Sequence, residues 1–441
     1  MAEGKRICIV GGGAGGLSAA WYLAERGYKN VVVLEKSDRP GGKCDSFTHD
    51  NRTSDLGAFT LTLGYRHVLD IARRLGANLE PQPRRLGVRW DTNPPRVAGI
   101  LRSLRDDYSL LQLALSGGRY LRALWRYRSV LGPPGFAGVS RNGRFPELCL
   151  PFAEWAKQYG VEPLIEVFRL PVTDMGYGHV RQVPAAFVLE YMNFLNVLTI
   201  TLYVLGLAFG WPKRLHDGFG RLWERVAWRL DVRLCTDIEN ITRGSEITVT
   251  WSENCLGEDG TTQRATRTQT FDHLILACPP QVTKTFLDWS ADEQQLYEQI
   301  KYNDYYITVC EVAGLPLETL DALHGLEPGH PWQIMRPWPH DDVAVFYTSG
   351  ESDADKILRN IRSDIARVFP AARVGQVLQH VNWAYFPHAS DDALAAGYYD
   401  ALEALQGQRA TYVVGGLPAF ETVEHVVRYS HALVERFFPR A

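Results

Sequence analysis

The pattern of apolar and polar positions in the first sixty residues predicts two strands joined by a helix. Residues 7–10 form an apolar run rich in β-branched side chains, and a second apolar run covers residues 31–34. Between them Leu17, Ala20, Trp21 and Ala24 recur at helical spacing, which predicts a helix over residues 17–26. A strand, a helix and a second strand in this order indicate a nucleotide-binding type of β-α-β unit.

Further elements follow along the chain. The pattern predicts helices over residues 65–75, 222–230, 352–369 and 423–438. It predicts strands over residues 88–90, 232–238, 247–251, 269–271, 302–313, 343–347 and 411–414. Residues 272–280 form a buried run that ends in two prolines, which is typical of a strand in a parallel sheet. The fold class that follows is α/β, or α+β over the whole chain.

Residues 194–211 are the most apolar part of the chain. Their sequence, FLNVLTITLYVLGLAFGW, contains no charged side chain, and its 18 positions approach the length of a membrane span. Asn196, Thr199, Thr201 and two glycines dilute the run. A buried helix that lines an apolar pocket explains it better, so any membrane contact is expected to be peripheral and to collect an apolar substrate.

Residues 109–131 form a basic helical region that we expect to be interrupted at Gly117 and Gly118. Arginines and large apolar residues alternate along it: Arg119, Leu121, Arg122, Leu124, Trp125, Arg126 and Arg128. Two interpretations stay open. The region is either a helix on a membrane surface or a solvated arginine face over a packed stripe, and we favour the second.

Three glycines and an acid carry the first chemical signal. Gly11, Gly13 and Gly16 have the spacing GxGxxG directly after the first strand, and Glu35 ends the second strand. In this pattern the first glycine permits a tight turn, the second lets backbone amides approach a pyrophosphate, and the third lets helix and strand pack closely. The helix N-terminus attracts phosphate, and the acid accepts hydrogen bonds from ribose hydroxyls. The sequence therefore predicts a dinucleotide site.

The next residues identify the dinucleotide. Arg39-Pro40-Gly41-Gly42-Lys43, then Ser46, then Asp55-Leu56-Gly57-Ala58 follow the acid. This order resembles the FAD-binding opening of the flavin amine oxidase and phytoene desaturase superfamily, which implies non-covalent FAD. The N-terminus of the helix over residues 423–438 is expected to face the flavin ring. The cofactor-binding residues that we expect are Gly11, Gly13, Gly16, Glu35, Lys36, Gly42, Lys43, Gly57, Ala58, Phe59, Ile238, Cys278, Gly415 and Val426.

Composition narrows the classes of partner. The chain has 441 residues, of which 46% are hydrophobic and 22% charged, and its net charge of −3 gives no reason to expect nucleic acid binding. Seven cysteines are scattered without a metal-binding spacing, so neither a disulfide framework nor a metal site is expected. Since the first strand begins at once, we expect no signal peptide and a cytoplasmic location. The oligomeric state cannot be read from the sequence.

Several longer blocks point to a subfamily. They are Gly41-Gly42-Lys43-Cys44, Leu150-Pro151-Phe152, Gly176-Tyr177-Gly178-His179, Val183-Pro184-Ala185-Ala186, Tyr191, Trp383-Ala384-Tyr385-Phe386-Pro387-His388 and Gln406-Gly407. Together they resemble bacterial polyenoic fatty acid isomerases nearly end to end. The resemblance implies a Rossmann-like FAD-binding domain, a β-sheet substrate domain and a helical cap. We assign residues 1–75, 216–285 and 406–441 to the FAD-binding domain, residues 76–215 to substrate strands and cap, and residues 286–405 to the substrate domain.

The same resemblance implies a redox-neutral flavin reaction on a polyunsaturated fatty acid. A hydride leaves a methylene between two cis double bonds and returns to a different carbon, which gives a conjugated diene. No side-chain acid or base is strictly required, so the protein orients the substrate and excludes water and oxygen. We therefore assign no catalytic side chain.

The resemblance also suggests residues for the substrate. The family binds the fatty acid carboxylate with an arginine in a segment matching Arg84-Arg85, and Arg85 is our candidate; a surface arginine in a loop is the alternative. Tyr177 is expected to line the flavin pocket, with a packed core tyrosine as the alternative. Where the family has an aromatic gate this chain has Ile200, and Phe194 or Tyr203 is a possible substitute.

A second departure concerns the cofactor. Superfamily members usually have an acid after the glycine of the late strand, and here Gly416 occupies that place. Glu421 and Glu424 follow several residues later and are expected to cap the last helix. His179, His388 and Cys278 are expected to be structural, whereas Lys301 is a candidate for the lysine that amine oxidases place near the flavin.

Three functions remain open from the sequence. The first is an FAD-dependent isomerase of a polyunsaturated fatty acid or a related polyene. The second is an FAD-dependent oxidase or desaturase of an amine or a polyene natural product that passes electrons to oxygen. The third is a flavin-binding partner subunit without turnover, which Gly416 would favour.

Overall fold

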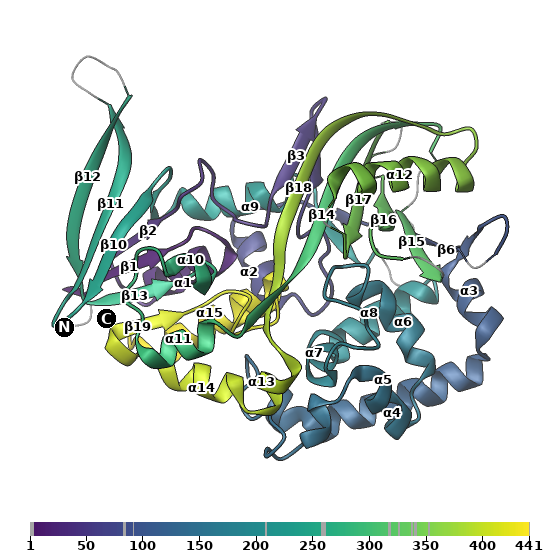
Figure 1. Cartoon of the computed structure of the whole chain (residues 1–441), viewed down its shortest axis with the longest axis horizontal. Coiled ribbons are helices and arrows are strands. Elements are labelled where there is room, and N and C mark those ends of the chain that lie inside the picture. Colours follow the sequence, from purple (N-terminus) through teal and green to yellow (C-terminus); the bar gives the residue numbers. More distant parts are fainter. Residues whose placement is uncertain are drawn as a thin grey trace.

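The computed structural model describes residues 4–82, 85–90, 92–207, 210–256, 262–315, 319–324, 327–336, 338, 342–351 and 353–440. Figure 1 shows a parallel sheet with its helices at the left, a large antiparallel sheet at the upper right and a group of helices at the lower right. The predicted mixed α/β fold is confirmed.

A five-stranded parallel sheet forms one half of the structure. Its strands run in the order β19 (Thr411–Val413), β13 (His273–Leu276), β1 (Arg6–Val10), β2 (Asn30–Leu34) and β9 (Asp231–Arg233). The helix α1 (Ala14–Glu25) connects β1 to β2, which pair in register from Arg6 opposite Asn30 to Val10 opposite Leu34. Because all neighbours are parallel, the carboxyl ends of the strands meet at one edge.

Alternating side chains of the parallel sheet are buried on both faces. Ile7 and Ile9 pack in a cluster with residues of α1 and of the last helix, α15 (Val423–Phe437). Cys8 and Val10 belong to the cluster on the opposite face, which includes Trp251 of a small antiparallel sheet. Coverage of both faces explains why β1 is apolar from Ile7 to Val10 rather than alternating.

The small antiparallel sheet contains β10 (Asp237–Arg243), β11 (Ile247–Leu256) and β12 (Thr262–Phe271). The prediction of one strand over residues 232–238 is wrong. The chain leaves β9 at Arg233 and begins β10 at Asp237, with Cys235 between them at a φ of +52°. The positive φ of Cys235 lies outside the β region, and the chain turns there from one sheet to the other.

A seven-stranded sheet forms the opposite half. Its order is β18 (Arg373–Ala389), β14 (Ile300–Ala313), β17 (Val343–Ser349), β16 (Pro331–Met335), β15 (Thr319–His324), β6 (Arg85–Arg89) and β7 (Arg96–Gly99). All pairs are antiparallel except β15 with β6. Ile357, Ile361 and Ile365 of α12 (Ala354–Val368) cover one face of this sheet. The other face carries Tyr305, Ile307 and Val309 of β14, which pack around Leu56 and Phe59.

In the described part of the chain, six α-helices lie between β7 and α9 (Gly218–Ala227). They are α3 (Ile100–Asp107), α4 (Leu110–Leu131), α5 (Phe152–Tyr159), α6 (Pro163–Val172), α7 (Ala185–Tyr191) and α8 (Phe194–Val204). The remaining α-helices are α2 (Arg66–Arg74), α10 (Pro280–Thr283), α11 (Ala291–Tyr297), α13 (Asp391–Ala395) and α14 (Tyr398–Leu405). The remaining strands form two pairs, β3 (Ser46–His49) with β4 (Arg52–Asp55) and β5 (Leu79–Pro81) with β8 (Lys213–Leu215).

Two predictions in the helical region need correction. The helix α4 runs without a break through Gly117 and Gly118, because Ser116 and Tyr120 on either side are packed against the protein. The apolar run of residues 194–211 is not one buried helix: α8 ends at Val204, and Phe194, Leu205 and Leu207 are each more than half exposed. Among the described residues no single helix meets the length and hydropathy needed to cross a membrane, and only α7 and α8 together do, bent by 68°.

Candidate functional site

A cavity of about 420 Å³ begins at the carboxyl edge of the parallel sheet and ends among α3, α6 and α8, within the usual range for ligand sites. Four strands of the parallel sheet open onto it. Gly11 follows β1, Glu35 follows β2, Cys278 lies two residues after β13, and Gly415 lies two residues after β19. The sheet topology therefore brings together segments from both ends of the chain.

Two glycine loops line the end of the cavity at the parallel sheet. Gly41 donates a backbone hydrogen bond to the carbonyl of Gly12 at 2.8 Å, and Gly42 approaches so closely that a Cβ there would lie 3.1 Å from the Cα of Gly13. A Cβ at Gly16 would lie 2.0 Å from the carbonyl oxygen of Gly11. Gly16 therefore lies beneath the loop and permits helix and strand to pack, while Gly11, Gly13 and Gly42 face the cavity.

Glu35 is fixed at the end of β2. Its two carboxylate oxygens accept hydrogen bonds from the backbone N–H groups of Gly12 at 2.5 Å and Ser37 at 2.8 Å, and it is nearly buried. Each oxygen keeps a second lone pair, so the carboxylate is oriented and still able to accept a hydroxyl. Lys36 points away, is 86% exposed and pairs with Asp237 at 3.8 Å.

The structure brings most of the predicted residues together. Those that line the cavity are Gly11, Gly13, Glu35, Gly42, Lys43, Gly57, Ala58, Phe59, Arg85, Tyr177, Ile200, Tyr203, Cys278, Gly415 and Val426. Gly16, Lys36, Phe194 and Ile238 do not line it. Ile238 packs against the apolar cluster behind β13, and Phe194 is 57% exposed at the start of α8. Lys36, Phe194 and Ile238 therefore lie outside the lining of this cavity.

An ion pair crosses the middle of the cavity. The Nζ of Lys43 lies 2.6 Å from Oε1 of Glu421 and donates to the carbonyl of Ala384 at 2.7 Å. The second carboxylate oxygen of Glu421 accepts a hydrogen bond from the backbone N–H of Phe386, whose φ is +50°. Glu421 thus ties the glycine-loop lysine to a strained backbone position of β18.

The expected capping role of the two late glutamates is wrong. Thr422 caps α15 by accepting a hydrogen bond from the backbone N–H of His425. Glu424 instead accepts hydrogen bonds from the backbone N–H groups of His67 and Val68, and so caps the first turn of α2. Glu421 lies in the cavity.

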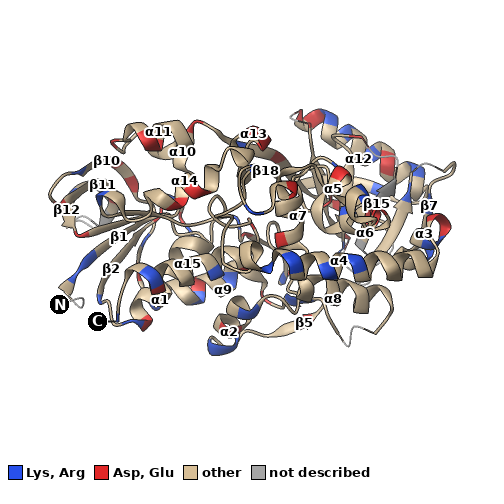
Figure 2. Cartoon of the chain, turned by 90° about the horizontal axis from the view of Figure 1, so that it is seen from below, with Lys and Arg blue, Asp and Glu red and all other residues tan. Residues whose placement is uncertain are grey.

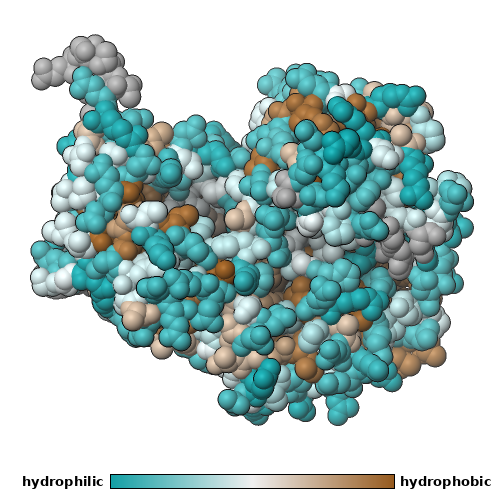
Figure 3. Space-filling model, viewed as in Figure 1, coloured by the Kyte–Doolittle hydropathy of each residue, from teal (hydrophilic) through white to brown (hydrophobic). Residues whose placement is uncertain are grey.

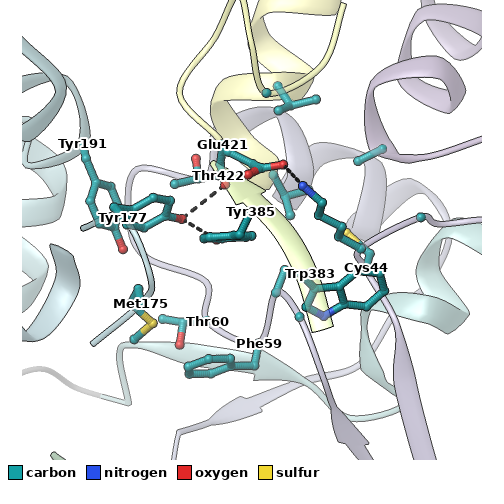
Figure 4. A pocket seen from close by; sticks show the side chains of 18 of the residues that line it. Cys44, Phe59, Thr60, Met175, Tyr177, Tyr191, Trp383, Tyr385, Glu421 and Thr422 are labelled. Atoms are coloured by element: carbon teal, nitrogen blue, oxygen red, sulfur yellow. Dashed lines mark hydrogen bonds and ion pairs between the residues drawn. The ribbon is translucent and has the colours of Figure 1, made fainter. Parts of the chain in front are cut away.

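Aromatic side chains form one wall of the cavity (Figure 4). The hydroxyl of Tyr385 donates to that of Tyr177 at 3.0 Å, and Tyr177 donates to the backbone carbonyl of Glu421 at 3.2 Å. Burial raises the pKa of both tyrosines well above their usual range, so both stay neutral. Tyr191, Trp383 and Tyr305 complete this wall. The sequence blocks around Tyr177 and Trp383 were recognised, but no local signal showed that they share one wall.

Arg85 lies at the far end of the cavity and is already paired. Its Nε and Nη2 atoms donate to the two carboxylate oxygens of Asp321 at 2.8 and 2.5 Å, and Asp321 is fully buried and also accepts from Gln333. The backbone N–H of Arg85 donates a hydrogen bond to the hydroxyl of Tyr203 at 2.8 Å. Arg84 lies outside the described residues. The sequence could not indicate Asp321, which is 236 positions away.

Near this pair lies a second buried acid. Asp174 is fully buried, and neither of its carboxylate oxygens has a hydrogen-bond partner. Burial raises its pKa well above the usual range, although Arg169 and Arg85 act in the opposite direction. This direction favours the protonated form of the carboxyl group.

Other candidates lie elsewhere. Lys301 is exposed on β14 and does not line the cavity. Burial lowers the pKa of His179 and of His388, and neither lines the cavity. Cys278 lines it, and burial raises the pKa of its thiol to about 12.

The end of the cavity at the glycine loops fits a dinucleotide. A Cβ at Gly13 would meet no atom closer than 3.9 Å, so the loop has an open face toward the cavity. The first turns of α1 and α15 both line the same space, and each presents the positive end of a helix. Of the described lining residues only Glu35, Lys43, Arg85 and Glu421 carry a charge, and no histidine is among them. The end of the cavity among α3, α6 and α8 therefore suits an apolar compound.

Comparison with known proteins agrees with this geometry. The family described as flavin containing amine oxidoreductase matches residues 14–411. The chain is 24% identical over 460 residues to the FAD-dependent oxidoreductase oblC of Cochliobolus heterostrophus, covering 98% of this chain and 90% of that protein. It is 41% identical over 78 residues to the zeta-carotene-forming phytoene desaturase of Myxococcus xanthus, covering 18% and 15%. Among solved structures, the CLA-producing fatty acid isomerase from P. acnes superposes with a TM-score of 0.81 at 24% identity, covering 99% and 100%.

Proposed function

Because the chain belongs to the flavin-containing amine oxidoreductases and its cofactor is FAD, we propose that it is a double-bond isomerase of a polyunsaturated fatty acid or a related polyene. The reaction moves one double bond into conjugation with another and leaves the substrate at its original oxidation level. The full-length likeness to a fatty acid isomerase supports this proposal.

One observation carries the proposal: an apolar cavity whose charged residues all hold protein partners. Glu35 is bound by two backbone amides, Lys43 and Glu421 bind each other, and Arg85 binds Asp321. Among the described lining residues, this leaves no free carboxylate or imidazole to remove a proton. Hydride chemistry needs no such group, whereas most proton-transfer chemistry does.

The protein's own contribution is orientation and exclusion of water. Bound FAD supplies a flavin ring that can take up and give back a hydride. Gly11, Gly13 and Glu35 would hold its nucleotide end, and the first turn of α15 lies next to the aromatic wall. Tyr177 and Tyr385, fixed by their hydrogen bonds, present a flat and neutral surface for an acyl chain whose double bonds are separated by a methylene group.

The direct experiment is anaerobic incubation of the purified yellow protein with linoleic acid, following conjugated-diene absorbance and flavin absorbance together. Many turnovers of conjugated product with the flavin oxidised at steady state are expected. A Tyr177→Phe variant serves as a matched probe, because it keeps the ring and loses the hydroxyl that binds the backbone of Glu421. Its product yield is expected to fall while the flavin stays bound.

Two outcomes would contradict the isomerase. Stoichiometric bleaching of the flavin that recovers only on admission of air identifies an oxidase. Retention of FAD with no change in either signal, for linoleic acid and for longer polyenes alike, leaves a flavin protein without this activity.

A second candidate function is an FAD-dependent oxidase or desaturase of an amine or a polyene natural product. The observation that favours it is the Arg85–Asp321 pair, which already neutralises the cation available to a substrate carboxylate. A substrate without an acid group would suit such a site. Oxygen consumption separates the two candidates, since a returned hydride uses no oxidant.

A further inference from the structure

The outward face of α4 is apolar and basic. The helix buries Ser116, Tyr120, Ala123, Tyr127 and Leu131 on one side. Of the ten large hydrophobic side chains that are exposed in the described part of the chain, five lie on α4 and three at the ends of α8, namely Leu110, Leu111, Leu115, Leu121, Trp125, Phe194, Leu205 and Leu207. Figure 3 shows hydrophobic surface at the lower right edge of the molecule, where α4 begins. Apolar surface gathered in this way marks an interaction face.

The charge on α4 has one sign. Its 22 residues include four arginines and no acid, and Figure 2 shows the corresponding basic bands along the helix. Arg128 lies 4.1 Å from the ring centre of Trp125, and Arg126 pairs with Glu147 at 3.3 Å. Among the described residues, Glu147 is the acid that forms an ion pair with an arginine of this helix, so positive charge remains in excess.

This face of α4 adjoins the end of the cavity among α3, α6 and α8. Ile100 of α3, Leu170 of α6 and Val204 of α8 line the cavity. The same three side chains pack in one cluster with Leu113, which lies one turn into α4. An apolar molecule leaving a bilayer at α4 would therefore meet apolar side chains from the surface to the cavity.

We propose that α4, together with the exposed ends of α8, docks on the surface of an anionic lipid bilayer and that the cavity receives its apolar substrate there. Tryptophan and arginine side by side suit the headgroup region, where the ring lies at the apolar boundary and the guanidinium binds phosphate. An uncharged protein partner would not account for the excess of positive charge on α4. This proposal rests on the proposed function only for the chemical class of the substrate.

The test is co-sedimentation of the FAD-loaded protein with vesicles of phosphatidylcholine alone and with added phosphatidylglycerol. Binding is expected to the anionic vesicles and to weaken as salt is added. A Trp125→Ala variant is expected to bind roughly tenfold more weakly, because it loses both the ring and the site on which Arg128 stacks. Trp228→Ala is the matched control: Trp228 is 69% exposed against 68% for Trp125, and Arg221 lies 4.6 Å from its ring centre.

Three results overturn the proposal. They are no binding to either vesicle, equal losses in the two tryptophan variants, and a dimer in sedimentation that Trp125→Ala dissociates, which would assign the face to a second copy of the chain. Flavin absorbance of each variant shows that it is folded. Since vesicle binding needs no turnover, the docking face and the isomerase reaction can fail separately.

Discussion

Glu421 fills the space that a side chain at position 416 would need. A Cβ built on Gly416 would lie 3.0 Å from Cγ of Glu421 and 3.1 Å from its Cβ and Cδ. The glycine at 416 and the acid at 421 are therefore one arrangement, in which a carboxylate reaches the cavity from five residues further along the chain.

Removing this carboxylate is expected to weaken FAD binding. In Glu421→Ala the Nζ of Lys43 loses its ion-pair partner, and the backbone N–H of Phe386 loses its acceptor. We expect FAD to dissociate about tenfold more readily. Equilibrium titration of the apoprotein with FAD, followed by flavin fluorescence, measures the change.

A relocated acid provides the control. Gly416→Glu alone crowds Glu421 and is expected to lower FAD affinity, whereas the double change with Glu421→Ala is expected to recover part of it. If Gly416→Glu alone binds FAD as tightly as the wild type, the steric relationship between the two positions is wrong.

The Arg85–Asp321 pair predicts opposite effects of its two members on a carboxylate substrate. Asp321→Asn leaves the guanidinium charge without its counter-ion, so the KM for linoleic acid is expected to fall severalfold, whereas Arg85→Gln is expected to raise it about tenfold. Steady-state kinetics with the free acid and with its methyl ester measure the effect. The ester is expected to respond to neither change, and an equal response of ester and acid would remove Arg85 from carboxylate binding.

Two glycines predict opposite effects of the same substitution on stability. Gly16→Ala places a methyl group 2.0 Å from a backbone oxygen, so loss of FAD and of folded protein is expected. Gly117→Ala meets no atom within 4 Å on a continuous helix. It is expected to stabilise the protein by about 0.5–1 kcal/mol. Thermal unfolding measures both, and a destabilising Gly117→Ala would contradict the unbroken α4.

Asp174 predicts a pH dependence of stability. Because burial raises its pKa, the folded state keeps a proton that the unfolded state releases above its ordinary pKa. Stability therefore falls as pH rises from that value toward the raised one, by up to about 1.4 kcal/mol per pH unit. Asp174→Asn carries no such proton, so its thermal midpoint is expected to fall less than that of the wild type between about pH 6 and 8. Parallel curves for the two proteins would mean that Asp174 is ionised in the fold.

Local signals predicted the nucleotide-binding half well. Gly11, Gly13 and Glu35 act through backbone turns and strand ends that lie within a few residues of them, so their spacing carries the information. Errors arose where packing overrides local preference. Gly117 and Gly118 predict a break, yet the buried side chains of α4 stabilise one continuous helix. The run of residues 194–211 without charges predicts a buried helix, yet Phe194 and Leu205 are exposed.

The substrate half could be predicted only in part. Arg85 was found from a resemblance, but its partner Asp321 comes from a strand 236 positions later, and strand pairing across that distance leaves no local pattern. The role of Glu421 was hidden for a related reason. A search for an acid at position 416 cannot show that a later residue folds back into the same space.

The parallel sheet is completed late in synthesis. Strand β19 at residues 411–413 is its outer member beside β13, and the first turn of α15 lines the cavity that Gly11 opens. A ribosome that has made the glycine loops must add nearly four hundred more residues before the opposite wall exists. A cavity lined from both ends of the sheet therefore exists only in chains whose synthesis has passed the first turn of α15.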